Sequence, residues 1–111
     1  MLTDAEVDAL PQPIRDGLLG VRRPDGLRYP RFQVLVRNGD VTVPPSWSQL
    51  HQLLAPAGWS DENLLMWTLS PNAYLEGDSP AHEVQVHPDG ATARLRWAVD
   101  EAIPRARKAP R

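Results

Sequence analysis

The residue types best suited to chemistry in this sequence are its three histidines and its adjacent carboxylates. A histidine metal site needs side chains that converge, such as two histidines four residues apart on a helix, and His51, His82 and His87 lack that spacing. The pairs Asp61-Glu62 and Asp100-Glu101 are neighbours in sequence, so on a helix they point in different directions. They fit capping and solubility better than general acid–base catalysis. The sequence also lacks a serine nucleophile elbow, a Gly-rich phosphate loop and cysteine, so we predict no enzyme activity, metal or cofactor.

The composition excludes several classes of protein. The 111 residues are 41% hydrophobic and include four tryptophans, which favours a folded domain with a modest core over a disordered chain. No apolar run reaches the length of a membrane span, and the first residues lack the basic and apolar regions of a signal peptide. The formal net charge of −2 gives no general attraction to nucleic acid. Together with the absence of cysteine, these features predict a cytoplasmic protein without a membrane partner, and they argue against a nucleic-acid partner.

Residues 59–80 contain the most informative local signals. Ser60 is a good helix N-cap, and Asp61 and Glu62 follow it in the first turn, where the helix dipole favours negative charge. Apolar residues at helical spacing follow, namely Leu64, Leu65, Trp67 and Leu69. Ser70-Pro71 ends this helix, because proline lacks an N–H group and restricts the residue before it. Residues 72–78 form a turn, and Ser79-Pro80 begins the next helix. Such a corner can also be purely structural.

A β-hairpin is the other clear element. Phe32, Val34 and Val36 alternate with polar or outward positions, and Asn38-Gly39 is the preferred two-residue hairpin turn. This turn pairs Arg37 with Asp40, Val36 with Val41, and Val34 with Val43, so that the apolar side chains share one face. An isolated hairpin is marginally stable in water, so this face must pack on helices or extend a sheet across a dimer.

Further helices are predicted on both sides of these elements. Thr3 and Glu6 have the spacing of a capping box, and Pro13 opens a second short helix that ends at Gly20, followed by a loop over residues 21–26. Ser46 and Gln49 form another capping box, for a helix that Pro56 and Gly58 end. A helix from Pro80 reaches about Val86, and Asp89 caps a last helix that Pro104 ends. Its buried side carries Ala91, Leu95, Ala98, Val99 and Ala102. The predicted fold is α+β and mostly helical, a small bundle of short helices with one β-hairpin at about residues 32–43.

These segments together resemble a known family. The run from Trp67 to Asn72 (Trp-Thr-Leu-Ser-Pro-Asn), followed by Leu75, Gly77 and Pro80, resembles the toxin-binding domain shared by Xre, MbcA and ParS-type antitoxins of bacterial toxin–antitoxin systems. Residues 29–33, Tyr-Pro-Arg-Phe-Gln, look like the strand that often precedes it. The likeness extends from Tyr29 to about Val99. It implies three segments: N-terminal short helices and loop (1–28), a toxin-binding-like domain (29–103) and a basic C-terminal tail (104–111).

The resemblance implies a protein partner, a cognate toxin that is commonly of the RES type and consumes NAD, and a steric mode of neutralisation. The residues expected at this partner are Trp67, Ser70, Pro71, Asn72, Leu75, Glu76, Gly77, Pro80, Trp97, Arg105 and Arg107. About 28 residues precede the Tyr29 motif, too few for the helix-turn-helix region of such antitoxins, so we expect a stand-alone toxin-binding domain. Glu76 stands where the family often has a small residue, and residues 82–84 are more polar than its usual leucine-rich helix start.

Other interpretations of the same residues remain open. Trp97 lies off the apolar stripe of its helix, so it is either exposed or buried by another helix or by a partner. Arg22, Arg23 and the basic tail could contact phosphate, although they are few and not interleaved with aromatic residues. The alternatives to an antitoxin are therefore a regulatory or adaptor protein without a toxin partner and a small nucleic-acid-binding protein. A homodimer through the hairpin edge is also possible.

Overall fold

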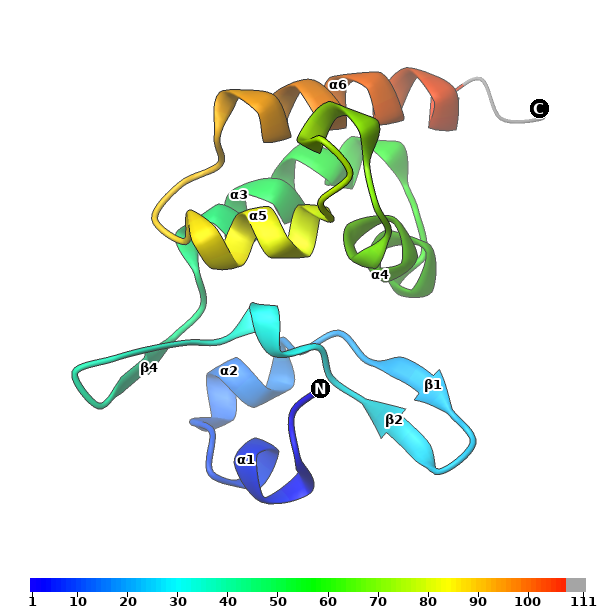
Figure 1. Cartoon of the computed structure of the whole chain (residues 1–111). Coiled ribbons are helices and arrows are strands. Elements are labelled where there is room, and N and C mark those ends of the chain that lie inside the picture. Colours follow the sequence, from blue (N-terminus) through cyan, green and yellow to red (C-terminus); the bar gives the residue numbers. More distant parts are fainter. Residues whose placement is uncertain (108–111) are drawn as a thin grey trace.

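Short helices dominate the structure (Figure 1). The computed structural model describes the backbone of residues 1–107 and the side chains of residues 1–103. Within residues 1–107 the backbone forms six α-helices, three 3₁₀ turns and two antiparallel sheets of two strands each. The prediction of a mostly helical α+β fold is therefore confirmed. The prediction of a single hairpin is wrong, because a second one precedes it.

The N-terminal segment contains two short helices and the unpredicted hairpin. α1 (Asp4–Asp8) begins with the predicted capping box between Thr3 and Glu6, and α2 (Gln12–Asp16) has Pro13 in its first turn. Strands β1 (Val21–Arg23) and β2 (Gly26–Arg28) replace the predicted loop and pair antiparallel. The Pro24-Asp25-Gly26 signal does mark a turn, but three-residue strands are too short to give a recognisable alternation.

The predicted hairpin is present with the predicted register but is shorter. β3 (Leu35–Arg37) pairs with β4 (Asp40–Thr42), which places Val36 opposite Val41 and Arg37 opposite Asp40. Asn38 and Gly39 both have positive φ, 51° and 82°, as a turn of this length requires. The predicted pairing of Val34 with Val43 is wrong, because the Val34 N–H donates instead to the Arg31 carbonyl, 3.1 Å away.

That hydrogen bond closes η1 (Arg31–Gln33), a 3₁₀ turn where the resemblance implied a strand. The turn aims Phe32 into the helical core, where its ring meets that of Trp47 edge-on with centroids 4.8 Å apart. Gln33 is also buried, and its side-chain amide forms two hydrogen bonds with the backbone of Leu19. Oε1 accepts from the Leu19 N–H at 2.8 Å, and Nε2 donates to the Leu19 carbonyl at 2.9 Å. η1 therefore fastens the N-terminal segment to the rest of the chain.

The first long helix is α3 (Pro45–Leu54), followed by η2 (Ala55–Ala57). The predicted capping box at its start is wrong. The helix begins two residues early, with Pro44 at the cap, so Ser46 lies inside the first turn and its buried Oγ has no partner among the described residues. Gln49 reaches across the fold instead, and its Oε1 accepts the Ala91 N–H at 2.8 Å. Gly58 ends the segment in the left-handed conformation (φ 68°), as predicted.

The C-terminal half contains α4 (Asp61–Leu69), η3 (Ala73–Leu75), α5 (Pro80–Val86) and α6 (Ala93–Arg107). Ser60 and Ser79 cap α4 and α5 as predicted, accepting the N–H groups of Asn63 and His82. Two predictions for α6 are wrong. Thr92, and not Asp89, caps the helix, because Asp89 pairs with Arg37 at 2.7 Å. Pro104 does not end it. Proline removes one backbone hydrogen bond, but the bonds on both sides of it still carry the helix to Arg107.

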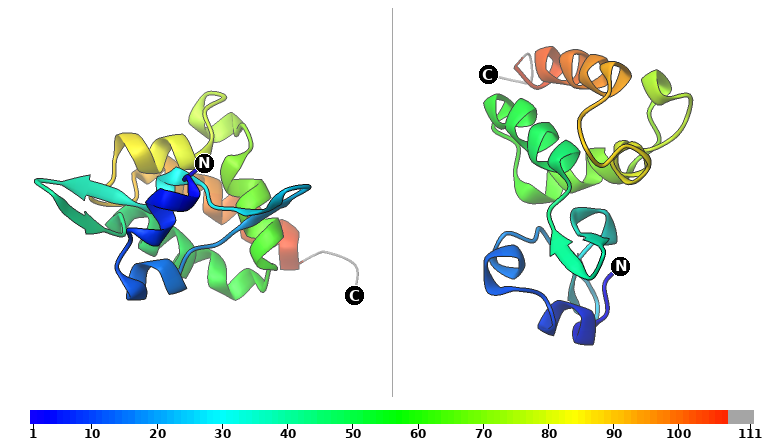
Figure 2. Two further views of the ribbon diagram at one scale, coloured as in Figure 1. Left: turned by 90° about the horizontal axis from the view of Figure 1, so that it is seen from below. Right: turned by 90° about the vertical axis from the view of Figure 1, so that its left-hand side faces the viewer.

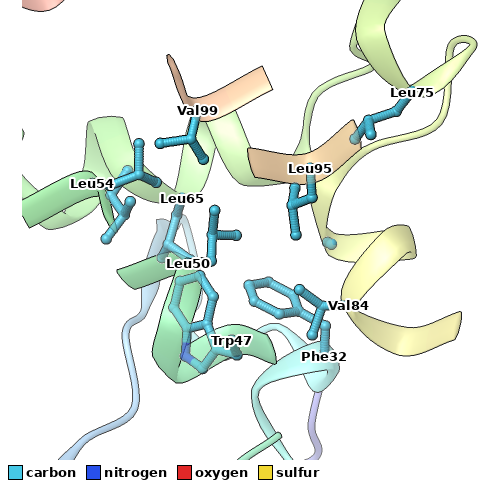
Figure 3. Close-up of a cluster of buried hydrophobic side chains, with 11 residues drawn as sticks. Phe32, Trp47, Leu50, Leu54, Leu65, Leu75, Val84, Leu95 and Val99 are labelled. Carbon is cyan, nitrogen blue, oxygen red and sulfur yellow. The ribbon is translucent and has the colours of Figure 1, made fainter. Parts of the chain in front are cut away.

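The main core lies between α3, α4, α5, α6 and η1 (Figure 3). Its buried members come from every one of these elements, and Leu50, Leu75, Val84 and Leu95 have no exposed surface. The predicted buried face of α6 is confirmed for Leu95, Ala98, Val99 and Ala102, which are at most 9% exposed, whereas Ala91 precedes the helix and is only partly buried. This packing fixes the mutual positions of α4, α5 and α6, which carry the candidate site.

The N-terminal segment packs against one end of this helical bundle, and the β1–β2 and β3–β4 hairpins project from opposite sides of the molecule (Figure 2). The Leu2 N–H donates to the Tyr29 carbonyl at 2.8 Å, and Arg31 pairs with Glu6 at 2.5 Å. Residues 1–28 are thus tied to the start of the predicted toxin-binding segment at several points. The valine face of the second hairpin lines an open hollow of about 310 Å³ against Leu2 and Leu10.

Candidate protein-docking site

The predicted corner is held by hydrogen bonds at both of its ends. The Ser70 backbone turns extended (ψ 150°) before Pro71, and its hydroxyl donates to the Met66 carbonyl at 2.5 Å. The Asn72 side chain then caps η3 by accepting the Tyr74 N–H at 2.9 Å. The loop closes on itself, because the Asn72 N–H donates to the Asp78 carbonyl and the Asn72 carbonyl accepts from Gly77, both at 3.0 Å. The corner is therefore a fixed turn.

Two consecutive residues of this turn have left-handed backbone conformations. Gly77 has φ 89°, which glycine adopts without strain and other residues rarely do. Glu76 has φ 57° although it carries a side chain. This explains why a small residue suits position 76, and the tight closure between Asn72 and Asp78 holds glutamate in that conformation here.

A buried ionic cluster fixes α5 against the start of α6. Glu83 is 1% exposed, and its carboxylate accepts hydrogen bonds from Nε and Nη2 of Arg94 at 2.8 and 2.6 Å. The Thr92 hydroxyl donates to the same carboxylate at 2.6 Å while accepting the Leu95 N–H that it caps. The hydrogen bonds from Arg94, together with that from Thr92, lower the pKa of Glu83 from 4.5 to about 2 despite its burial.

Between this fixed corner and α6 lies a groove of about 390 Å³. One wall is the end of α4 and the corner, and the other is a face of α6. The α6 side carries Ala98 and Ala102, one turn apart, whose short side chains leave room for the groove, together with the carboxylate of Glu101. The lining residues on the corner side are Trp67, Ser70, Pro71, Asn72, Ala73 and Tyr74.

A pair of aromatic rings stands beside this groove. Trp97, on α6, is 59% exposed, and its ring centroid lies 5.4 Å from that of Tyr74, which lines the groove. Of the two states predicted for Trp97, the exposed one is therefore observed in the isolated chain. Trp67, one of the apolar residues at helical spacing on α4, is only half-buried, and its ring centroid lies 5.9 Å from that of Trp59.

The predicted site residues lie in five different settings. Trp67, Ser70, Pro71 and Asn72 line the groove, Trp97 stands beside it, and Glu76 and Gly77 are exposed on the corner. Leu75 has no exposed surface and Pro80 is also buried, so these two support the corner from inside and offer no contact surface. The side chains of Arg105 and Arg107 lie outside the described residues.

Several residues of the site were not predicted from the sequence. Ala73, Tyr74, Ala98, Glu101 and Ala102 complete the groove, and Glu83 joins α5 to α6 through Arg94. The helical spacing of Ala98, Glu101 and Ala102 places these three residues on one face of α6, but it does not indicate which element that face meets. The burial of Glu83 has no local signal, because its partner Arg94 is eleven residues further along the chain.

The residues considered first for chemistry are dispersed. His51 is exposed and stacks on Trp47 with ring centroids 5.5 Å apart, and His82 and His87 are exposed on or beside α5. In the part of the chain that the structure describes, no three histidine, aspartate or glutamate side chains gather closely enough to hold a metal ion. None of the helices within residues 1–107 is long and apolar enough to cross a membrane. Arg22 and Arg23 are exposed on β1, on the far side of the molecule from α6.

Comparison with known proteins leaves this geometry as the main guide to function. No protein-family model, curated protein or solved structure matches the chain. The groove and the aromatic pair beside it are therefore the features of this chain that bear on its function.

Proposed function

We propose that this chain is an antitoxin-like protein-binding module that docks on a cognate toxin and blocks it sterically. The toxin is of the RES type, which consumes NAD, and the encounter takes place in the cytoplasm. The chain itself performs no reaction. The antitoxin assignment rests on the resemblance of residues 67–80 to the toxin-binding domain. The docking role rests on the groove.

The observation that supports docking most strongly is the exposure of Trp97 beside that groove. A tryptophan that leaves 59% of its surface in water is unusual unless a partner covers it, since tryptophan is among the residues most enriched at interface anchor points. Four residues of the motif, Trp67, Ser70, Pro71 and Asn72, line the adjacent groove. The motif and the exposed aromatic surface thus coincide in one place.

The rigidity of this surface also supports a docking role. A surface that is already in its bound shape loses little conformational entropy on association. The closed loop from Asn72 to Asp78 and the buried Glu83–Arg94 pair hold the two walls of the groove in place. A corner built only to reverse the chain would need neither the groove nor the exposed ring.

The proposal is tested by co-expressing the chain with the protein encoded by the neighbouring gene. The expected result is a stable complex, together with suppression of the NAD loss that the neighbour causes when expressed alone. A matched strain expressing the Trp97→Ala variant should lose this protection, and the Met66→Ala variant should keep it, because Met66 is equally exposed (62%) and does not line the groove. A neighbour that neither binds the chain nor consumes NAD would contradict the toxin assignment.

A further inference from the structure

The groove combines two features that together recognise a cation. Tyr74 is one of its lining residues and pairs its ring with that of Trp97, and Glu101 lines it from the facing helix. Among the lining residues, all of which belong to the described part of the chain, Glu101 is the one charged side chain. Aromatic faces attract cations through their quadrupole, and a carboxylate adds a directional hydrogen-bond acceptor.

The surroundings of the groove add further negative charge. Asp100 is exposed next to Glu101, and the corner carries Glu76 and Asp78. Arg94, at the start of α6, already gives two hydrogen bonds to Glu83. Glu76 and Asp78 lie close enough to Arg94 to raise its pKa, so this end of the molecule concentrates carboxylates around the corner.

We propose that the groove receives an arginine side chain of the protein partner, with the guanidinium stacked on Tyr74, bounded by Trp97 and hydrogen-bonded to the carboxylate of Glu101. This inference rests on the proposed function and specifies the chemistry of the partner's contact residue. Arginine fits better than lysine, because its planar guanidinium stacks on an aromatic face and still directs N–H groups sideways to a carboxylate. Ala98 and Ala102 make room for the long side chain.

The test uses the whole chain and a defined probe, the peptide acetyl-Gly-Arg-Gly-amide, in an NMR titration. We expect saturable shifts of the Trp97 indole N–H and of the backbone N–H groups of Ala73 and Tyr74, with a Kd on the order of 10 mM. The same peptides with norleucine or glutamate in place of arginine should give no saturable shift. A response of similar size to all three peptides, or no saturable response to the arginine peptide, would overturn the proposal.

Two variants with the same charge change separate the site from general electrostatics. Glu101→Gln should weaken binding of the arginine peptide by about two- to fivefold, whereas Asp100→Asn, one residue away and outside the groove lining, should change it by less than about 1.5-fold. Equal losses in both variants would show attraction to the surface as a whole and would overturn the specific site. The spectrum of each free variant reports directly whether it is folded.

Two outcomes separate the arginine contact from the toxin-binding role of this surface. If the arginine peptide does not bind but Trp97→Ala still weakens the complex with the toxin, the docking role of this face is supported and the arginine contact is rejected. If the peptide binds at Glu101 but no toxin complex forms, the cation site stands and the toxin assignment is removed.

Discussion

Glu83 and Arg94 form a two-point ion pair inside the fold, with the carboxylate accepting from Nε at 2.8 Å and from Nη2 at 2.6 Å. The pair joins α5 to the first turn of α6, and Thr92 completes it while capping that helix. Both walls of the docking groove depend on this joint, because α5 follows the corner and α6 carries the opposite face. Glu83 is therefore a residue on which the packing of α5 against α6 depends.

This pair predicts how stability depends on pH. The pKa of Glu83 is about 2 in the folded protein, against an ordinary value of 4.5, because Arg94 donates to its charged form. A carboxyl with a lowered folded pKa contributes stability that is fully present above about pH 4.5 and is lost as the pH falls toward about 2. Chemical denaturation at a series of pH values should show the unfolding free energy of the native chain falling across this window.

The Glu83→Gln variant provides the comparison for that measurement. It should be less stable at neutral pH by about 3 kcal/mol, the lower end of the range for breaking a buried pair, since the Arg94 side chain is 38% exposed. Its stability should fall less in acid. Glu6 titrates in the same window, its pKa being lowered to about 2 by the Arg31 hydrogen bonds, but that exposed pair is screened by salt. A steep acid loss that persists in Glu83→Gln at high salt would contradict the role given to Glu83.

The Phe32→Ala variant tests whether the N-terminal segment and the helical bundle fold as one unit. Its ring is 3% exposed and packs on Trp47, so Phe32→Ala should destabilise the chain by about 3–5 kcal/mol. Leu27→Ala, at a position 52% exposed on β2, should change the free energy of unfolding by no more than about 0.5 kcal/mol. Thermal unfolding followed by circular dichroism measures both. Equal effects of the two variants would contradict the joining role of η1.

Gly77 tests the conformation of the corner. No atom lies within 4 Å of the place where a Cβ would be, so the cost of Gly77→Ala comes from its φ of 89° and not from a clash. We expect a loss of about 1–2 kcal/mol in the free energy of unfolding, measured by urea denaturation. Gly58→Ala, also without a clash and with φ 68°, is the matched control outside the site. Both should be destabilised similarly, but only Gly77→Ala should also weaken partner binding.

Local signals in the sequence predicted the elements whose structure is set locally. Ser60, Ser79 and the Thr3–Glu6 box cap the helices as expected, and Asn38-Gly39 sets the hairpin register, because these effects act within a few residues. Long-range contacts decided the rest. Ser46 does not cap α3, because the helix already begins at Pro45. Asp89 does not cap α6, because it forms an ion pair with Arg37 of the hairpin.

The candidate site was predictable to the same extent. The run from Trp67 to Asn72 contributes four of the groove-lining residues. The off-stripe position of Trp97 left open whether its ring is exposed or covered, and the structure shows it exposed. Which face of α6 would lie opposite the corner depends on how the helices pack, so Glu101 and Tyr74 could not be assigned to the site from spacing. Leu75 and Pro80 belong to the motif, but their burial gives them a supporting role.

The most direct test of the docking account is a calorimetric titration of the purified chain against the purified protein encoded by the neighbouring gene, inactivated where it is toxic. We predict a single binding event, and Trp97→Ala should weaken it at least about 30-fold, the effect expected for an interface anchor. Met66→Ala should keep the affinity within about twofold of the native value. Both variants should have the same midpoint temperature of thermal unfolding as the native chain. Unchanged affinity in Trp97→Ala, or a complex in which the groove beside α6 remains open to solvent, would contradict the account.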